Sequence, residues 1–303
     1  MDLSVVNHED YFAKIGDDHK FPINKFGELA NYLLKKKIVN KFHKPLPCSE
    51  ETLKRAHSEE YIKNVKNKTL DENTIKKIGF PLVDSVIQRS LVATGGTVLA
   101  SKLAINNGVA CNTAGGSHHA NFEGGAGYCV FNDLAYTAAR LRAEGAVERV
   151  LILDCDVHQG DGTARILEQH PDIFTCSVHC RANYPARKAT SDLDVEIDQG
   201  ADDIGYLDIL ANTLSRLDLL WPNPDLVLYD AGVDIHEDDR LGLLNVTYDG
   251  IRARDLMVLK HFRGRGVPVA TVIGGGYGTD LDEGAYRHSL VFRAALAVAQ
   301  DPA

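Results

Sequence analysis

The densest run of metal-ligand and acid–base residues lies at 154–162, where the sequence reads Asp-Cys-Asp-Val-His-Gln-Gly-Asp-Gly. The run follows a short apolar segment that is typical of a buried strand. Because alternate residues of a strand share a face, we expect Asp154, Asp156 and His158 to point the same way. Two carboxylates and an imidazole would be costly at the end of a buried strand without a compensating charge. The run therefore predicts a divalent-metal site rather than an ion-paired turn.

A second acidic segment, residues 230–242, follows another apolar run and begins with Asp230 and Asp234. Either carboxylate could join Asp156 and His158 in a three-ligand site. Three protein ligands with an open fourth position are typical of catalytic zinc. Residues 237–240 of the same segment are expected to form a solvated loop.

Two adjacent imidazoles, His118 and His119, lie in a glycine-rich stretch. In a tight loop both can reach one pocket, and histidine titrates near neutral pH, so the pair is suited to proton transfer. Asp154 and Asp161 could each accept a hydrogen bond from one of them and set its tautomer.

A glycine-rich turn at residues 274–278 presents one phenol, Tyr277. Beside a metal, that hydroxyl would stabilise the oxyanion of an acyl-transfer reaction. A phosphate-binding loop is disfavoured because no Lys, Ser or Thr follows in the required spacing. In the earlier run 124–133, Tyr128 is expected to line a narrow channel, while Asn132 or Asp133 caps the next helix.

The segments that position these residues alternate between two types. Short apolar runs, bounded by polar residues or glycine, are typical of buried parallel strands and occur at residues 109–112, 149–154, 173–178, 226–229 and 267–273. Helical patterns occur at residues 26–36, 82–106, 133–144, 162–169, 204–217, 251–263 and 284–299. This alternation predicts a doubly wound α/β fold.

The candidate residues follow four different predicted strands. The carboxyl ends of strands are where open α/β sheets bind ligands, so residues far apart in sequence are expected to converge there. Residues 67–81 are polar and irregular and are expected to form a surface loop. No repeat or linker divides the chain, and residues 1–303 are predicted to form one domain.

Composition limits the function classes. Hydrophobic residues make up 44% of the 303, which excludes a disordered or fibrous chain. The net charge of −9 disfavours nucleic-acid partners. No apolar run reaches the roughly 18 residues of a membrane span, and residues 1–10 lack a signal core. The six cysteines include no C-x-x-C pair, so we expect reduced thiols in a cytoplasmic protein.

Together these motifs resemble the zinc-dependent histone deacetylase family. The segments that carry the resemblance occur in the family's order, and they are His118-His119 and residues 127–133, 154–162, 230–234 and 274–277. The similarity extends from about His19 to near the C-terminus. Residues 19–25 and 234–242 are most similar to the class IV branch and its bacterial relatives. The resemblance implies a three-layer arginase/deacetylase-like α/β fold with a central, mainly parallel sheet.

The resemblance also implies the metal sites. One catalytic Zn²⁺ would be bound by Asp156, His158 and Asp234. A structural K⁺ would lie near Asp154, Asp156, His158 and Ser177.

The same comparison implies catalytic roles. His119 would act as general base and acid, with His118 as its electrostatic partner. Asp154 and Asp161 would orient His118 and His119 respectively. Tyr277 would donate a hydrogen bond to the substrate carbonyl.

The implied substrate is an acyl-lysine of a protein or peptide, or an acylpolyamine, with no nucleic-acid or membrane partner. Gly127, Tyr128 and Tyr184 match the substrate-binding positions, and the two tyrosines would enclose the acyl-lysine chain. Family members that deacetylate peptides carry an acidic residue on the rim, whereas residues 78–81 here contain no carboxylate. Two other functions remain open: a two-manganese ureohydrolase of related fold and a catalytically silent acyl-lysine reader.

Overall fold

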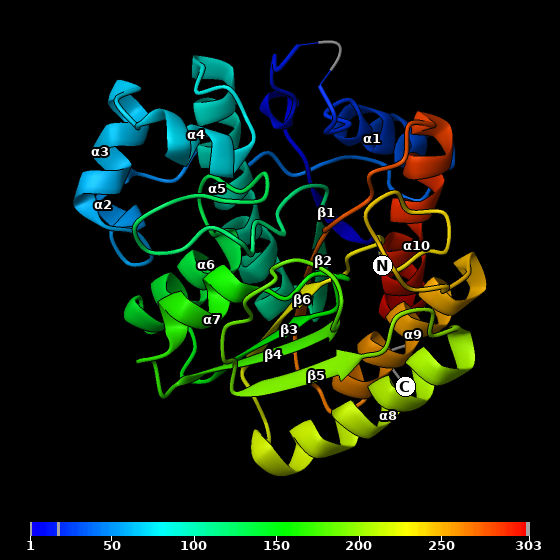
Figure 1. The fold of residues 1–303 in the computed structure, drawn as a ribbon. Helices are drawn as coiled ribbons and strands as arrows, with labels where there is room; N and C mark the ends of the chain where they lie inside the picture. Colours follow the sequence, from blue (N-terminus) through cyan, green and yellow to red (C-terminus); the bar gives the residue numbers. More distant parts are fainter. Residues whose placement is uncertain (1, 17–18, 301–303) are drawn as a thin grey trace.

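The centre of the fold is a seven-stranded parallel sheet in the order β1-β2-β7-β6-β3-β4-β5 (Figure 1). The structure is a computed structural model that describes residues 2–16 and 19–300. The strands β1 to β7 are Ser4–Val6, Val109–Asn112, Val150–Asp154, Ile173–Cys180, Leu193–Ile197, Leu226–Asp230 and Val269–Val272. All five predicted strands are present, and the predicted α/β fold with a parallel sheet is confirmed.

Helices cover both faces of the sheet, giving three layers (Figure 1). The helices α1 to α10 are Lys25–Lys35, Glu50–Leu53, Glu59–Asn67, Glu72–Ile78, Asp84–Asn107, Asp133–Ala143, Asp161–Leu167, Asp203–Leu220, Tyr248–Arg263 and Leu281–Gln300. Helices α5, α6 and α7 form one outer layer, and α8, α9 and α10 form the other. All seven predicted helices are present with small shifts of their ends.

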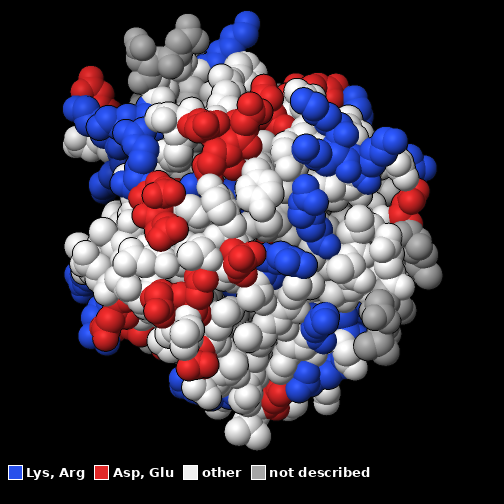
Figure 2. Space-filling view, turned by 90° about the vertical axis from the view of Figure 1, so that its right-hand side faces the viewer, with Lys and Arg blue, Asp and Glu red and all other residues white. Residues whose placement is uncertain are grey.

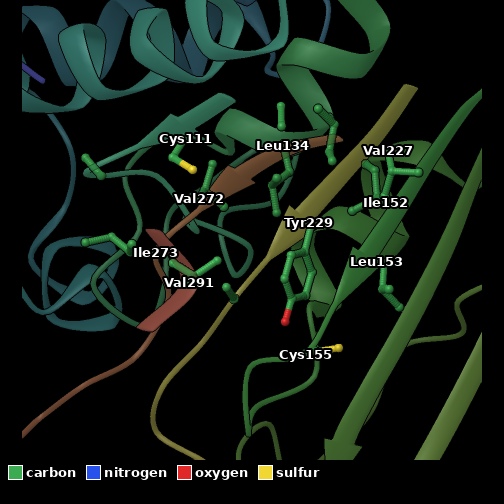
Figure 3. Packing of buried hydrophobic residues seen from close by; sticks show 14 of the residues in the cluster. Cys111, Leu134, Ile152, Leu153, Cys155, Val227, Tyr229, Val272, Ile273 and Val291 are labelled. Atoms are coloured by element: carbon green, nitrogen blue, oxygen red, sulfur yellow. The ribbon is translucent and has the colours of Figure 1, made fainter. Parts of the chain in front are cut away.

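Apolar residues on both faces of the strands explain why the sheet lies inside. Ile152 of β3 and Val227 of β6 are at most 1% exposed and lie in one packed cluster (Figure 3). Leu134 of α6 and Val291 of α10 join that cluster from the two helical layers. Full burial of one such aliphatic side chain contributes roughly 1.5–3 kcal/mol, so the cluster holds the strands firmly in register.

The prediction of a surface loop at residues 67–81 is wrong, because α4 lies within it. The side chain of Asp71 caps this helix by accepting hydrogen bonds from the backbone N–H groups of Asn73 and Thr74. Gly79 ends it with a positive φ of 79°, and Ile78 is buried. The polar composition hid a short helix whose caps, rather than an apolar stripe, define it. The edge strands β1 and β5 were also not predicted.

The four strands that carry the candidate residues are neighbours, in the order β2-β7-β6-β3. Asp154 and Asp230, the last residues of β3 and β6, are register partners. The carboxyl ends of these strands therefore meet at one edge of the sheet, as predicted.

The surface carries both signs of charge. On the face shown in Figure 2, basic and acidic side chains form separate small groups and neither sign covers the surface. Among the described helices, none is long and apolar enough to cross a membrane. All six cysteines are free, as predicted, and all are buried.

Candidate active site

Asp156, His158 and Asp234 form a buried cluster just beyond β3 and β6. One ligand-type atom from each lies within 4.8 Å of the others. The His158 Nδ1 atom is 2.9 Å from Asp156 Oδ1 and 3.0 Å from Asp234 Oδ2. None of the three residues is more than 6% exposed. The structure thus brings together the three residues expected to bind a metal.

The donor set of this cluster fits a divalent metal ion. Burial alone would lower the pKa of His158, but Asp156 and Asp234 outweigh burial and raise that pKa to about 10. Asp234 Oδ1 accepts from the backbone N–H of Val157 at 3.0 Å, whereas the buried Oδ2 has only the ion-pair contact with His158 and no regular hydrogen bond from the described residues. Two buried carboxylates beside one imidazole are costly without a further positive charge, and carboxylate oxygens and imidazole nitrogens are both ligands that zinc takes in proteins.

The prediction that Asp154, Asp156 and His158 share one face of a strand is wrong. Strand β3 ends at Asp154, so Asp156 and His158 lie in the following loop and do not share a strand face with it. The Asp154 side chain instead turns to His118, whose Nδ1 is 2.7 Å from Asp154 Oδ2. The backbone N–H of Asp156 donates to Asp154 Oδ1 at 3.1 Å, which closes the turn.

The structure also separates the two aspartates that the sequence left open. Asp230 lies with His118 and Asp154 in a second buried group whose ligand-type atoms are within 4.8 Å of one another. Neither carboxylate oxygen of Asp230 has a hydrogen-bond partner among the described residues. Burial and then the charge of Asp154 raise the pKa of Asp230 well above its usual range. Asp234, not Asp230, joins Asp156 and His158.

The rings of the two adjacent histidines, His118 and His119, face one another beside the cluster, with His118 Nε2 3.9 Å from Asp156 Oδ1. Their Nε2 atoms are 3.2 Å apart, and His119 Nδ1 is 2.8 Å from Asp161 Oδ1. Burial, followed by the charges of His118 and His158, lowers the pKa of His119 well below its usual value. Burial opposes protonation of His118 too, but Asp154 and Asp156 outweigh it and raise that pKa well above 6.5. One imidazole is thus favoured as neutral and the other as a cation, a division typical of acid–base pairs.

Asn132 and His57 brace the histidine loop. Asn132 caps α6, as predicted, by accepting from the backbone N–H of Ala135, and its amide donates to Ala120 O at 3.0 Å. The backbone N–H of Asn132 in turn donates to His57 Nε2 at 2.9 Å, while His57 Nδ1 lies 2.9 Å from Asn121 O. Burial lowers the pKa of His57 to about 4, which favours this neutral, bridging form. His57 was not predicted, because no motif of ligand-type or acid–base residues surrounds it in the sequence.

The loop that carries Tyr277 approaches the metal ligands closely. A Cβ atom on Gly275, which has a φ of 57°, would lie 2.2 Å from Asp234 Cγ. Only glycine allows this approach. Lys25 is buried, and its ammonium donates to the carbonyl oxygens of Gly275 and Gly276. The phenol is therefore held beside the cluster from a helix far away in sequence.

Asp239 holds the same loop from the other side. Its carboxylate accepts from the backbone N–H of Tyr277 at 2.9 Å and lies 3.4 Å from Arg287 Nη1. Asp239 is only 7% exposed. The expectation that residues 237–240 form a solvated loop is therefore wrong for Asp239, although it is right for the exposed Glu237, Asp238 and Arg240.

Arg254 of α9 ties the two metal-ligand loops together from behind. Its guanidinium donates to the carbonyl oxygens of Gly232 and Cys155, the latter at 3.3 Å. Asp255 accepts from Arg254 Nε at 3.0 Å and from the Tyr229 hydroxyl at 2.6 Å. Cys155 and Gly232 lie in the loops that carry Asp156 and Asp234, so one buried arginine sets their separation.

A pocket of about 620 Å³ opens above the cluster. Its lining includes the three expected substrate-binding residues, the oxyanion candidate Tyr277, and His119 and His158. The full set is Lys76, Lys77, Ile78, Gly79, His119, Ala126, Gly127, Tyr128, His158, Ala182, Asn183, Tyr184, Leu241 and Tyr277. A Cβ on Gly127 would lie 2.4 Å from His119 Cδ2. The Tyr184 ring stands perpendicular to that of His119, with centroids 4.8 Å apart. The two tyrosines thus line the same pocket, as expected.

Comparison with known proteins finds related sequences. A model of the histone deacetylase domain matches residues 19–291. An uncharacterized protein of Picosynechococcus is 44% identical over 98% of this chain and its own full length. Histone deacetylase 2 of Arabidopsis thaliana is 31% identical over 91% of this chain and 74% of its own. Human histone deacetylase 1 is 28% identical, over 82% of this chain and 54% of its own.

A solved structure shares the fold. The crystal structure titled HDA15 HD domain superposes with a TM-score of 0.81 at 20% identity, covering 98% of this chain and 89% of that one. The family match spans most of the chain, and it includes every residue of the pocket floor described above. The chain therefore belongs to the histone deacetylase family of hydrolases.

Proposed function

We propose that this chain is a zinc-dependent amidohydrolase that removes acetyl or longer acyl groups from lysine side chains. The observation that carries the proposal is the buried group of three ligand-type residues beneath one pocket, next to two histidines. Of these two, His118 is favoured as a cation and His119 as the neutral imidazole. Residues 19–25 and 234–242 support a place in the class IV-like branch. We propose that residues 1–303 form one catalytic domain.

In this proposal Asp156, His158 and Asp234 hold the zinc ion. When bound, zinc supplies a Lewis acid that activates water and polarises the amide carbonyl. A structural monovalent cation is proposed near Asp154, Asp156, His158 and Ser177. The register of β3 and β4, which pairs Asp154 with Ser177, supports that second site.

Proton transfer is assigned to the histidine pair. The lowered pKa of His119 supports its role as the base that takes a proton from the attacking water. Asp161 accepts from His119 Nδ1, so Nε2 is the basic nitrogen. The cationic preference of His118 supports electrostatic stabilisation of developing negative charge. The same pair then returns the proton to the leaving amine.

Tyr277 is assigned to the oxyanion. Burial and the nearby charges of Asp156 and Asp234 raise the pKa of its phenol well above 10, so the hydroxyl keeps its proton at neutral pH. A protonated phenol beside the reacting carbonyl would donate a hydrogen bond as negative charge develops.

A parallel hydrolysis assay tests this function. The zinc-loaded chain would be offered an acetyl-lysine peptide, a myristoyl-lysine peptide and an acetylpolyamine. We expect hydrolysis of an acyl-lysine peptide, and a loss of about 10²–10³-fold in kcat for Tyr277→Phe. His119→Ala is expected to lose about 10²–10⁴-fold. Wild-type rates in either variant on a cognate substrate would contradict the assignment.

One observation favours a second candidate, the two-manganese ureohydrolase. The group of His118, Asp154 and Asp230 lies beside the first cluster and offers three more ligand-type atoms. Tightly bound metal would be counted per chain after expression with manganese and zinc supplied. Two manganese ions per chain, with hydrolysis of a guanidino substrate, would favour this alternative over the deacylase.

A further inference from the structure

The proposed function leaves two substrate types that differ in charge. An acylpolyamine keeps protonated amines close to its amide, whereas an acyl-lysine in a peptide takes its surrounding charge from neighbouring residues. The charge at the pocket mouth therefore discriminates between them.

The mouth of this pocket is basic. Among the residues that line it, apart from His119 and His158, the charged side chains are Lys76 and Lys77. No carboxylate among the described residues lines the pocket. This contrasts with the chain as a whole, whose net charge is −9.

Backbone hydrogen bonds fix these lysines at the mouth. They occupy the last turn of α4, and the N–H of Gly127 donates to Lys77 O at 3.0 Å. The N–H of Tyr128 donates to Ile78 O at 2.7 Å. The end of α4 is thus joined directly to the segment that lines the substrate channel.

No strong ion pair neutralises the charge of either lysine, so both ammonium groups can interact with a ligand. Lys76 lies 3.9 Å from Glu72, but both side chains are more than 70% exposed and such pairs are weak. Lys77 lies within 4.0 Å of no carboxylate among the described residues. Flexible side chains keep both ammonium groups within a Debye length of the mouth, about 10 Å at 0.1 M salt.

A third ammonium, that of Lys188, lies outside the pocket lining and supports the loop that carries Tyr184. Lys188 Nζ donates to Asn183 O at 2.6 Å and to Pro185 O at 2.7 Å, which fixes the loop that carries Tyr184. The cationic side chains of the lining itself are therefore Lys76 and Lys77.

We propose that the mouth of this pocket selects acyl-lysine residues with acidic neighbours and rejects acylpolyamines, and that Lys76 and Lys77 determine this specificity. The inference rests on the proposed deacylase function. It supplies the substrate class that the absence of a carboxylate at residues 78–81 leaves open.

The test uses one acyl-lysine in three peptides, flanked by Glu, Gln or Lys, together with an acetylpolyamine. The kcat/KM values of the zinc-loaded chain would be measured at low and high salt. We expect the Glu-flanked peptide to exceed the Lys-flanked one by about three- to tenfold at low salt, through KM rather than kcat. High salt should reduce this difference, and the polyamine should be the poorest substrate.

Two double variants test whether Lys76 and Lys77 cause the preference for acidic flanks. Lys76→Glu with Lys77→Glu should reverse the order of the peptides, while the matched control Arg252→Glu with Lys260→Glu, exposed on α9, should preserve it. An unchanged order in the Lys76/Lys77 variant would overturn the inference. A wild-type preference for the Lys-flanked peptide would overturn it as well. If no peptide is hydrolysed, including the Gln-flanked one, the deacylase proposal itself fails.

Discussion

The floor and the mouth of the pocket differ in how firmly their residues are held. The floor residues Asp156, His158 and Asp234 are at most 6% exposed, and contacts from several strands and helices fix them. At the mouth, Tyr184 is 48% exposed and Lys77 extends from the end of a short helix. Breaking a buried charge pair costs roughly 3–5 kcal/mol, whereas an exposed pair contributes at most about 1 kcal/mol. Floor substitutions should therefore abolish function, and mouth substitutions should only change preference.

The largest effect is expected for Asp234→Asn on the floor. The amide keeps the shape of the side chain but removes a charged donor from the proposed metal cluster, so we expect near-complete loss of bound zinc. The value of kcat/KM should fall by about 10³-fold or more. Loss of the metal should lower the rate at least as much as loss of one group that stabilises the transition state. Metal content by mass spectrometry and peptide hydrolysis would measure both changes.

Asp230→Asn is the matched control. Asp230 is equally buried and lies in the same segment, but it is grouped with His118 and Asp154. We expect this variant to keep the metal of the first cluster. If both variants lost the same amount of zinc, the distinction between the two buried groups would be wrong.

A smaller floor effect is expected for Arg254→Met. The substitution removes the donor shared by Gly232 O and Cys155 O, so the two ligand loops lose their fixed separation. Loss of a group that orients metal ligands typically lowers metal affinity by about 10–100-fold. Zinc affinity would be measured by competition with a chelator.

Arg89→Met separates this effect from the cost of removing any buried arginine. Arg89 is 6% exposed and donates to Tyr11 O, away from both ligand loops. Both variants should unfold at lower denaturant concentration, but only Arg254→Met should weaken zinc binding. Equal zinc affinities in the two variants would show that Arg254 acts on folding alone.

The chemistry of the floor was predictable because it follows strand ends. His118, Asp154, Asp161 and Tyr277 each lie just after or near an apolar run, and parallel strands bring their carboxyl ends together. The sequence could not order the strands, so the choice between Asp230 and Asp234 stayed open until the resemblance to a family was used.

The supporting residues were not predictable, for a different physical reason. Lys25, His57, Asp239 and Arg254 are polar residues whose partners are distant in sequence, and each would ordinarily be placed on the surface. Their burial depends on long-range packing that no local pattern records. The short helix α4 was missed because caps, not periodicity, define it.

The pH dependence of stability tests one of these supports. Burial lowers the pKa of Lys25 to about 8, below its unfolded value near 10.5. The charged form is therefore disfavoured in the folded state: the penalty is full below pH 8 and disappears as the pH rises toward 10.5. Relative to Lys25→Met, the wild type should gain stability over this window, by up to roughly 3 kcal/mol. Urea unfolding of both proteins at pH 7 and pH 10 would measure the gain, and parallel curves would contradict the assigned burial.

The smallest effect is expected at the mouth, for Tyr184→Phe. The ring of Tyr184 packs perpendicular to His119, and Phe keeps that contact while removing a hydroxyl from a half-exposed side chain. Because exposed polar groups contribute little, kcat/KM on an acyl-lysine peptide should change by less than about threefold, equivalent to roughly 0.6 kcal/mol. Tyr184→Ala removes the ring as well, and should raise KM by about tenfold, with a smaller change in kcat. A large loss in the Phe variant would mean that the hydroxyl takes part in the reaction. Tyr184 would then belong with the floor residues, despite its half-exposed side chain.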